Sequence, residues 1–336
     1  MKFLSNRVRT DTTLRRSGIV AAAILVFCLT NPAFGESHHA VRLVKTDPAR
    51  VDIYVGKDLF ASYQSGIGFH KPIFHPLLSP KGHRLLRAYP MEFGVPDEHT
   101  DHWHHEGISF TYGNVNGVDF WSKLSGGRDK PGSGRIRHTG FTRLEDGEKG
   151  VMETTSDWIA PSGKVVLKQD SRMTIGAGSG WRTLDLRFEL TAQEKAVTFN
   201  DTKEGMMAIR VAPNLREDRT GRYLNAQGLE LSKAVWGKRS SWVALRGSVQ
   251  GEDLTLAIMN HPESIEFPTF WHARGYGLFS ANPFGKKDFQ KGSPPLNVSL
   301  EPGESALFLY RILVHSGHLS QSRMAARYEE YQATKP

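Results

Sequence analysis

The feature that most constrains the fold is the alternation of apolar and polar residues in Thr183–Leu190, "TLDLRFEL". Side chains of a β-strand point alternately to its two faces, so a period of two predicts a strand with one buried and one wet face. Short segments of similar or β-branched character recur between Gly, Pro, Asn and Asp residues, at 51–55, 107–112, 164–167, 196–199, 206–211, 254–259 and 306–314. The sequence has no βαβ rhythm and no glycine-rich phosphate loop. We therefore predict an all-β protein.

The number of predicted strands exceeds what a seven-stranded sandwich needs. We expect one domain over residues 36–336, built as a large two-sheet sandwich (a supersandwich), because about 300 residues can bury roughly three quarters of their unfolded surface. Only residues 320–332 have helical spacing, with Met324, Ala325, Tyr328 and Tyr331 three to four positions apart. They predict a short C-terminal helix.

Residues 1–35 have the pattern of a signal peptide. Arginines between Arg7 and Arg16 precede an apolar segment at 19–30 and the small-residue site Ala33-Phe34-Gly35. The apolar segment is shorter than the roughly 20 residues that cross a bilayer, and no similar segment follows. We expect a periplasmic or secreted protein without a membrane span after signal removal. The single cysteine, Cys28, would leave with the signal.

The charge of the chain does not indicate nucleic-acid binding. Removal of residues 1–35 takes away five basic and one acidic side chains, which lowers the formal net charge from +8 to +4. The remaining basic residues are scattered and form no run longer than a pair, as on a solvated surface. No nucleic-acid partner is predicted.

The stretch "DHWHHEGISF", residues 101–110, gathers three histidines, two carboxylates and a tryptophan. If it enters a strand, His102 and His104 share one face, and two imidazoles at i and i+2 can reach one metal ion. Cupin-type sandwiches use this spacing, but with a glutamate where this chain has Ile108 and Ser109. No metal is therefore favoured, and a divalent ion held by His102 and His104 is the alternative.

The same histidines suit acid–base chemistry on a sugar. Such chemistry needs a histidine that titrates near neutral pH, a carboxylate, and aromatic faces on which a sugar ring can stack. In this prediction one histidine of the stretch donates a proton, Glu204 accepts one, and His272 with Arg274 orients hydroxyls. The predicted catalytic residues are His102, His104, His105, Glu204 and His272, and the predicted substrate-binding residues are Trp103, Asp119, Arg210, Trp271, Arg274 and Asn282. The alternative for the three histidines is a local hydrogen-bonding role in a loop, and the alternative for Glu204 is a position in a surface turn.

Four separated stretches carry a resemblance to a known family. They are "DHWHHEGISFTYGNVNGVDFW", "TKEGMMAIRVAP", "WGKRSSWV" and "FPTFWHARGYGLFSANPFG". Together they resemble the bacterial secreted family labelled PmoA or methane-oxygenase-like, over about residues 60–318. Where that family has Asp-His-Pro-His-His, this chain has Trp103 in place of the proline. Membrane methane monooxygenase activity is not expected, because that subunit is a multi-helix membrane protein.

A more distant resemblance is to the galactose-mutarotase-like supersandwich of aldose epimerases and polysaccharide-processing enzymes. It implies a groove for sugar, lined by a histidine-glycine stretch and by a later histidine and glutamate. We expect an exported protein that processes or binds a carbohydrate or glycoside through a His/Glu groove, as an epimerase, lyase or hydrolase. The alternatives are a metal-dependent oxygenase or hydrolase that uses the histidines at 102–105, and a non-catalytic sugar-binding module.

Overall fold

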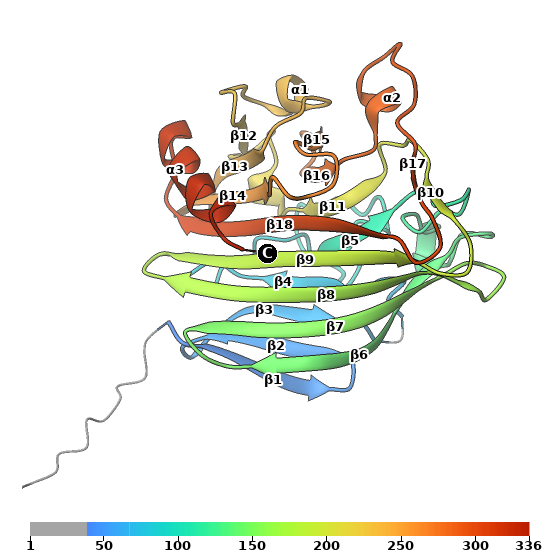
Figure 1. The fold of residues 1–336 in the computed structure, drawn as a ribbon. Coiled ribbons are helices and arrows are strands. Elements are labelled where there is room, and N and C mark those ends of the chain that lie inside the picture. The colour runs from blue at the N-terminus through green and yellow to red at the C-terminus, as the bar shows by residue number, and fades with distance from the viewer. Residues whose placement is uncertain (1–38, 67, 336) are drawn as a thin grey trace, which may run out of the picture. The chain divides into compact units, whose positions relative to one another are not determined.

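The computed structural model describes residues 39–66 and 68–335, and two eight-stranded antiparallel sheets dominate it (Figure 1). The first sheet has the order β1 (Val41–Asp47), β2 (Arg50–Val55), β3 (Asp58–Gln64), β4 (Ile73–Leu77), β5 (Ile108–Tyr112), β11 (Gly205–Arg210), β16 (Leu278–Asn282) and β15 (Phe270–Ala273). The second has the order β12 (Arg222–Asn225), β13 (Trp242–Val249), β14 (Glu252–Asn260), β18 (Ser305–Ser316), β9 (Trp181–Ala192), β8 (Val165–Gly178), β7 (Lys149–Ile159) and β6 (Arg135–Glu145). The prediction of an all-β two-sheet sandwich is confirmed.

The remaining elements are smaller, and a C-terminal helix follows the last strand. They are the paired strands β10 (Val197–Phe199) and β17 (Val298–Leu300), the 3₁₀ turns η1 (Ser125–Gly127) and η2 (Pro213–Leu215), and the helices α1 (Ser232–Val235), α2 (Lys286–Phe289) and α3 (Gln321–Gln332). Among the described residues, no helix is both long enough and apolar enough to cross a membrane. The predicted signal peptide, residues 1–35, lies outside the described residues.

The core lies between the two sheets, where alternate side chains of facing strands meet. In β9, Leu184, Leu186, Phe188 and Leu190 are buried while the residues between them are partly exposed, as the sequence alternation predicts. Phe188 stacks on Phe110 of β5 with ring centroids 4.1 Å apart. This contact joins the two sheets directly.

The C-terminal helix α3 covers part of the outer face of the second sheet (Figure 1). It begins after Ser320, whose hydroxyl accepts a hydrogen bond from the backbone N–H of Arg323 and so caps the first turn. Its buried residues Met324, Tyr328 and Tyr331 pack on side chains from β12, β13, β14 and β18. The prediction of a short C-terminal helix is confirmed.

The outer face of the first sheet carries the polar residues of interest. In β11, Met207 and Ile209 point into the core, so Ala208 and Arg210 point to the opposite face. There Ala208 packs in a small separate apolar cluster with Trp121 and Leu278.

The histidine stretch does not enter a strand, which corrects the expected alternation of its side chains. Strand β5 starts only at Ile108, and the backbone N–H of His105 donates to the carbonyl of His102 in a turn, at 3.0 Å. Gly107 separates turn and strand at a φ of 52°, and a Cβ there would lie 2.3 Å from the carbonyl oxygen of Phe74. His102 and His104 therefore do not share a strand face, and the i, i+2 strand geometry assumed for a metal pair does not form.

Candidate functional site

One buried arginine holds the histidine stretch in shape. Arg87 is 2% exposed and donates hydrogen bonds to the backbone carbonyls of His99, Asp101, His102 and His105, at 2.8–3.1 Å. Burial lowers the pKa of Arg87 to about 10, so the guanidinium is still charged at neutral pH. The loop conformation therefore depends on a residue that precedes it by a dozen positions or more.

The stretch presents a carboxylate–imidazole pair, Asp101 and His102. Oδ1 of Asp101 accepts from Arg87 at 2.9 Å and from Arg210 at 3.0 Å, and its Oδ2 lies 2.9 Å from Nδ1 of His102. Burial alone would raise the pKa of Asp101, but Arg210, His102 and Arg87 outweigh it and lower the pKa. An ionised Asp101 favours the tautomer of His102 that carries its proton on Nδ1, and in that tautomer Nε2 is a proton acceptor.

Two further rings, those of His105 and Tyr276, stack with the His102 ring of this pair. The ring of His102 lies parallel to that of His105, with centroids 4.7 Å apart, and Tyr276 stacks on His102 at 5.6 Å. Nδ1 of His105 is 3.1 Å from the Arg210 guanidinium and must accept from it, and burial lowers the pKa of His105 well below 6.5. His105 is therefore a neutral hydrogen-bonding group at neutral pH.

Beneath the stretch lies a buried charge cluster. Glu106 accepts from Lys71 at 3.1 Å and from Lys123 at 2.8 Å, and Lys71 also donates to the carbonyl of His104. Burial would raise the pKa of Glu106, but the two lysines together lower it. Burial and then the charge of Lys71 lower the pKa of His104 to about 3, and its Nδ1 has no hydrogen-bond partner among the described residues.

A pocket of about 470 Å³, here called the aromatic pocket, opens next to these residues. It is lined by Ser232, Lys233, Trp236, Ala273, Arg274, Gly275 and Tyr276. Tyr276 connects the pocket to the histidine stretch, because it lines the pocket and also stacks on His102.

A chain of hydrogen bonds runs through His272 next to the pocket. Nε of Arg274 donates to Nε2 of His272 at 3.1 Å, and Nδ1 of His272 donates to the carbonyl of Lys203 at 3.1 Å. These bonds describe a neutral imidazole, and burial lowers the pKa of His272 to about 3.

Glu204 lies at the other end of β11 from Arg210. A strand rises roughly 3.3 Å per residue, so the two Cα atoms are about 20 Å apart. The Glu204 carboxylate forms an ion pair with Lys203 at 2.8 Å, and its charge acts on Tyr276. Glu204 therefore forms no hydrogen bond with the Asp101–His102 pair among the described residues.

Two predicted substrate-binding residues belong to the structural framework instead. Trp271 is fully buried in the core between the sheets, where its indole donates to the carbonyl of Ser240 at 2.9 Å. Asn282 is also fully buried and donates to the carbonyl of Thr202. Neither side chain can reach a ligand, which corrects both predictions.

Two further predicted substrate-binding residues, Asp119 and Trp103, lie in the loops around the histidine stretch. Oδ1 of Asp119 accepts from the backbone N–H groups of Trp121 and Ser122, as in an Asx turn, so its bonds order the loop. Trp103 packs edge-on against Tyr89, with ring centroids 4.9 Å apart. Both side chains are partly exposed, and neither contacts the Asp101–His102 pair through a hydrogen bond within the described residues.

Sequence reasoning missed Asp101, Arg87 and Tyr276 as site residues. Asp101 directly precedes His102, and this adjacency was the available signal. No local pattern marks Arg87, and Tyr276 is of a residue type that is also common in cores.

Among the described residues, no group of three or more His, Cys, Asp or Glu side chains is arranged to hold a metal ion.

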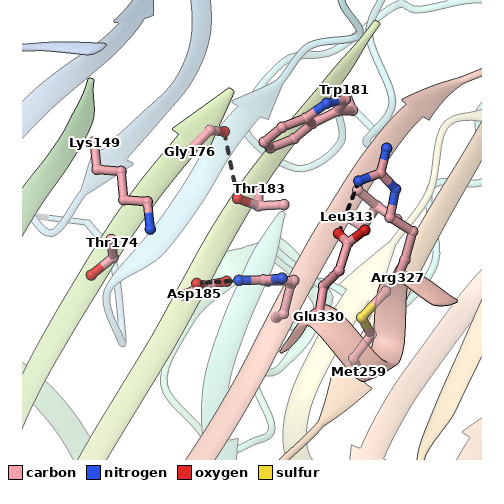
Figure 2. A pocket seen from close by; sticks show the side chains of 11 residues that line it. Lys149, Thr174, Gly176, Trp181, Thr183, Asp185, Met259, Leu313, Arg327 and Glu330 are labelled. Carbon is pink, nitrogen blue, oxygen red and sulfur yellow. Dashed lines mark hydrogen bonds and ion pairs between the residues drawn. The ribbon is translucent and has the colours of Figure 1, made fainter. Parts of the chain in front are cut away.

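A second pocket lies on the outer face of the second sheet next to α3 (Figure 2). Its acidic groups are already paired: Asp185 accepts two bonds from Arg311, at 2.5 and 2.6 Å, and Glu330 accepts from Arg327 at 2.9 Å. Its volume is about 100 Å³, well below that of the aromatic pocket. We therefore take the aromatic pocket as the candidate site.

The buried His272 predicts an acid-sensitive fold. Its pKa is about 3 when folded and ordinarily 6.5, so between these pH values the unfolded chain binds a proton that the folded chain does not. Its contribution to stability is full above pH 6.5 and is lost at about 1.4 kcal/mol per pH unit as pH falls toward 3. Urea unfolding at pH values from 7 to 4 gives the free energy of unfolding as a function of pH. The slope of this free energy against pH should be smaller for His272→Gln than for the wild type, by the equivalent of about one proton. The matched control His318→Gln, at an exposed site, should keep the wild-type slope, and equal slopes for all three proteins would contradict the prediction.

Several solved structures resemble the chain at low sequence identity. A galactose mutarotase-like protein from Clostridium acetobutylicum is 10% identical, with a TM-score of 0.40, over 82% of this chain and 98% of that one. A putative aldose 1-epimerase from Escherichia coli K12 is 9% identical, with a TM-score of 0.33, over 83% and 99%. A β-arabinopyranosidase is 9% identical, with a TM-score of 0.34, over 83% of this chain and only 38% of its own. Likeness of this degree says nothing about activity.

Sequence comparison gives a family but no curated relative. No curated protein has a significant sequence match to the chain. A family model described as "Family of unknown function (DUF6807)" matches residues 50–329. That description does not mention methane oxygenation, so the resemblance to the PmoA-labelled family stays a prediction.

Proposed function

The chain belongs to the family of unknown function DUF6807, so its activity has to be inferred from its own site, and we propose that it is an exported carbohydrate-active enzyme. In this proposal His102 moves a proton to or from an oxygen of a sugar that occupies the aromatic pocket. Export is inferred from residues 1–35 alone, which lie outside the described residues, and the mass of the mature protein tests it.

One observation carries the proposal: His102, paired with Asp101 and with no hydrogen bond to Nε2 among the described residues, stacks on Tyr276, which lines an open pocket. A carboxylate on Nδ1 orients the imidazole and stabilises the imidazolium that forms when Nε2 accepts a proton. The aromatic faces of Trp236 and Tyr276 suit the apolar face of a sugar ring, while Arg274 supplies hydrogen-bond donors.

The other histidines have supporting roles in this proposal. Burial lowers the pKa of His104, His105 and His272, so these imidazoles are neutral at neutral pH and act as hydrogen-bonding groups. In the reaction, neutral His102 accepts a proton from a sugar hydroxyl or a water as that oxygen becomes a nucleophile or forms a carbonyl. The imidazolium returns the proton to the ring or glycosidic oxygen that leaves carbon. This transfer serves epimerisation and hydrolysis alike.

The proposal is tested with protein purified without chelator and a panel of neutral and acidic oligosaccharides. Polarimetry reports epimerisation, ultraviolet absorbance reports elimination, and reducing-end release reports hydrolysis. We expect turnover of at least one sugar, unchanged after dialysis against EDTA. Binding without turnover would favour a sugar-binding module. Activity that is lost on dialysis and restored by a divalent metal would favour the metal-dependent alternative at His102 and His104.

Glu204 provides a sharp test of which group is the base. Because Glu204 is about 20 Å along β11 from Arg210 and is paired with Lys203, Glu204→Gln should keep turnover within about threefold of the wild type. The measurement is kcat on the sugar that the panel identifies. A loss of a hundredfold or more, with binding retained, would instead return the role of general base to Glu204.

A further inference from the structure

We infer that the aromatic pocket recognises the carboxylate of an acidic sugar, such as a uronate, through the guanidinium of Arg274. This inference deepens the proposed function and takes from it that the ligand is a sugar. It rests on the hydrogen bonds that Arg274 makes, on those it does not make, and on the charges around it.

Arg274 is a cation without an acidic partner in the described part of the chain. Its only side-chain hydrogen bond there runs from Nε to His272, and its guanidinium lies 5.6 Å from the ring centre of Trp236. The arginines Arg87, Arg210, Arg216 and Arg311, by contrast, each pair with a carboxylate within 3.0 Å. A guanidinium that lines a pocket with two terminal nitrogens unbonded in the described structure is suited to an external anion.

Hydrogen bonds through His272 fix the orientation of the Arg274 side chain. The carbonyl of Lys203 holds Nδ1–H of His272, and Nε2 of His272 in turn holds Nε–H of Arg274. With Nε engaged, the edge formed by the two terminal nitrogens stays available, and this edge matches the two oxygens of a carboxylate. His272 is thus a positioning residue for Arg274 in this inference.

The charges that surround the pocket favour an anion over a neutral ligand. Lys233 also lines it and has no ion pair among the described residues. Glu217 also lies at this wall, where its carboxylate accepts from two neutral donors, the backbone N–H and the hydroxyl of Ser232, both at 2.5 Å. Glu204 is paired with Lys203. Two cationic side chains, Arg274 and Lys233, therefore stand against one carboxylate that has no cationic partner in the described part of the chain.

The position of Arg274 also agrees with the proposed chemistry. Tyr276 lies two residues beyond Arg274 in the turn between β15 and β16, and stacks on His102. A sugar whose carboxylate contacts Arg274 can place its ring against Tyr276, the residue whose ring stacks on His102. The planar edge of one guanidinium can satisfy both oxygens of a carboxylate, and the hexose phosphate in the test below shows whether the site prefers a carboxylate to a phosphate.

Isothermal titration calorimetry tests the inference with disaccharides of galacturonate and glucuronate, the matching neutral disaccharides, and a hexose phosphate. We expect the wild-type protein to bind a uronate at least about tenfold more tightly than its neutral counterpart. Arg274→Gln should remove this preference, and Arg274→Lys should restore only part of it, because lysine keeps the charge but lacks the planar edge. The control Arg327→Gln, in the pocket of Figure 2, should leave it unchanged.

Other results would overturn the inference. These are equal affinity for acidic and neutral sugars, no uronate binding at all, tighter binding of the hexose phosphate, or a preference lost in Arg327→Gln instead of Arg274→Gln. The proposed function fails separately. If uronate binding depends on Arg274 but no sugar is turned over, the acidic-sugar site stands and catalysis does not. If a neutral sugar is turned over without any role for Arg274, catalysis stands and the acidic-sugar site does not.

Discussion

Replacing His102 with glutamine is expected to lower turnover by about a thousandfold while the protein stays folded and still binds sugar. Glutamine keeps hydrogen bonding at this position but cannot accept a proton at neutral pH. The His102 side chain is 42% exposed, so its removal leaves no buried cavity and should change stability little. The measurements are kcat on the identified sugar, calorimetric affinity for the same sugar, and a thermal melt.

Asp101→Asn should also lower turnover, by a different mechanism. The asparagine oxygen can still accept from Arg87 and Arg210, but its amide then faces Nδ1 of His102 as a donor. That contact moves the imidazole proton to Nε2, so the acceptor is lost. The two variants together therefore test whether proton acceptance by His102 depends on its contact with Asp101.

The chain offers a matched control for both substitutions. His318 and Asp253 form an exposed imidazole–carboxylate contact at 3.9 Å, remote in sequence from the histidine stretch. His318→Gln and Asp253→Asn should keep wild-type turnover. Unchanged turnover in His102→Gln would eliminate the proposed proton transfer, and loss of the folded state in that variant would reassign His102 to structure.

Much of the architecture could be predicted because strand and helix periods are local properties. The alternation at Thr183–Leu190 falls inside β9, and the helical spacing at 320–332 matches α3 within one residue. The strand order could not be predicted. Strand β11 pairs with β5 across nearly a hundred residues, and no local pattern specifies which distant strand a given strand will meet.

The candidate site could be predicted only in part, for a similar reason. His102 and Arg274 stand out by residue type, and the structure places both beside Tyr276. Periodicity does not distinguish aromatic residues that line a pocket from those that fill a core, so Trp271 was assigned to the ligand when it packs between the sheets. The prediction of Glu204 as the base uses only its place at the start of a strand, and nothing in the local pattern shows that Asp101 contacts His102.

Replacing Arg87 with methionine is expected to lower the free energy of unfolding by about 3–5 kcal/mol, the range for breaking a buried charge network from one side. Methionine fills similar apolar space but donates nothing. Four backbone carbonyls between residues 99 and 105 lose their shared donor, and Asp101 loses one of its two arginine partners. Buried acceptors without partners are costly, so the histidine stretch should loosen before the sheets unfold.

Urea unfolding gives the loss of stability, and hydrogen exchange of residues 99–107 reports the local change. The control is Arg84→Met, because Arg84 is 51% exposed and pairs with the exposed Glu92, so its removal should change stability by no more than about 0.5 kcal/mol. Turnover should also fall in Arg87→Met under conditions where the sheets are intact, since the Asp101–His102 pair is then no longer held. Wild-type stability and exchange in this variant would show that the loop keeps its shape without Arg87. In that case the geometry of the pair would have to come from Arg210 alone, the one guanidinium still bonded to Asp101.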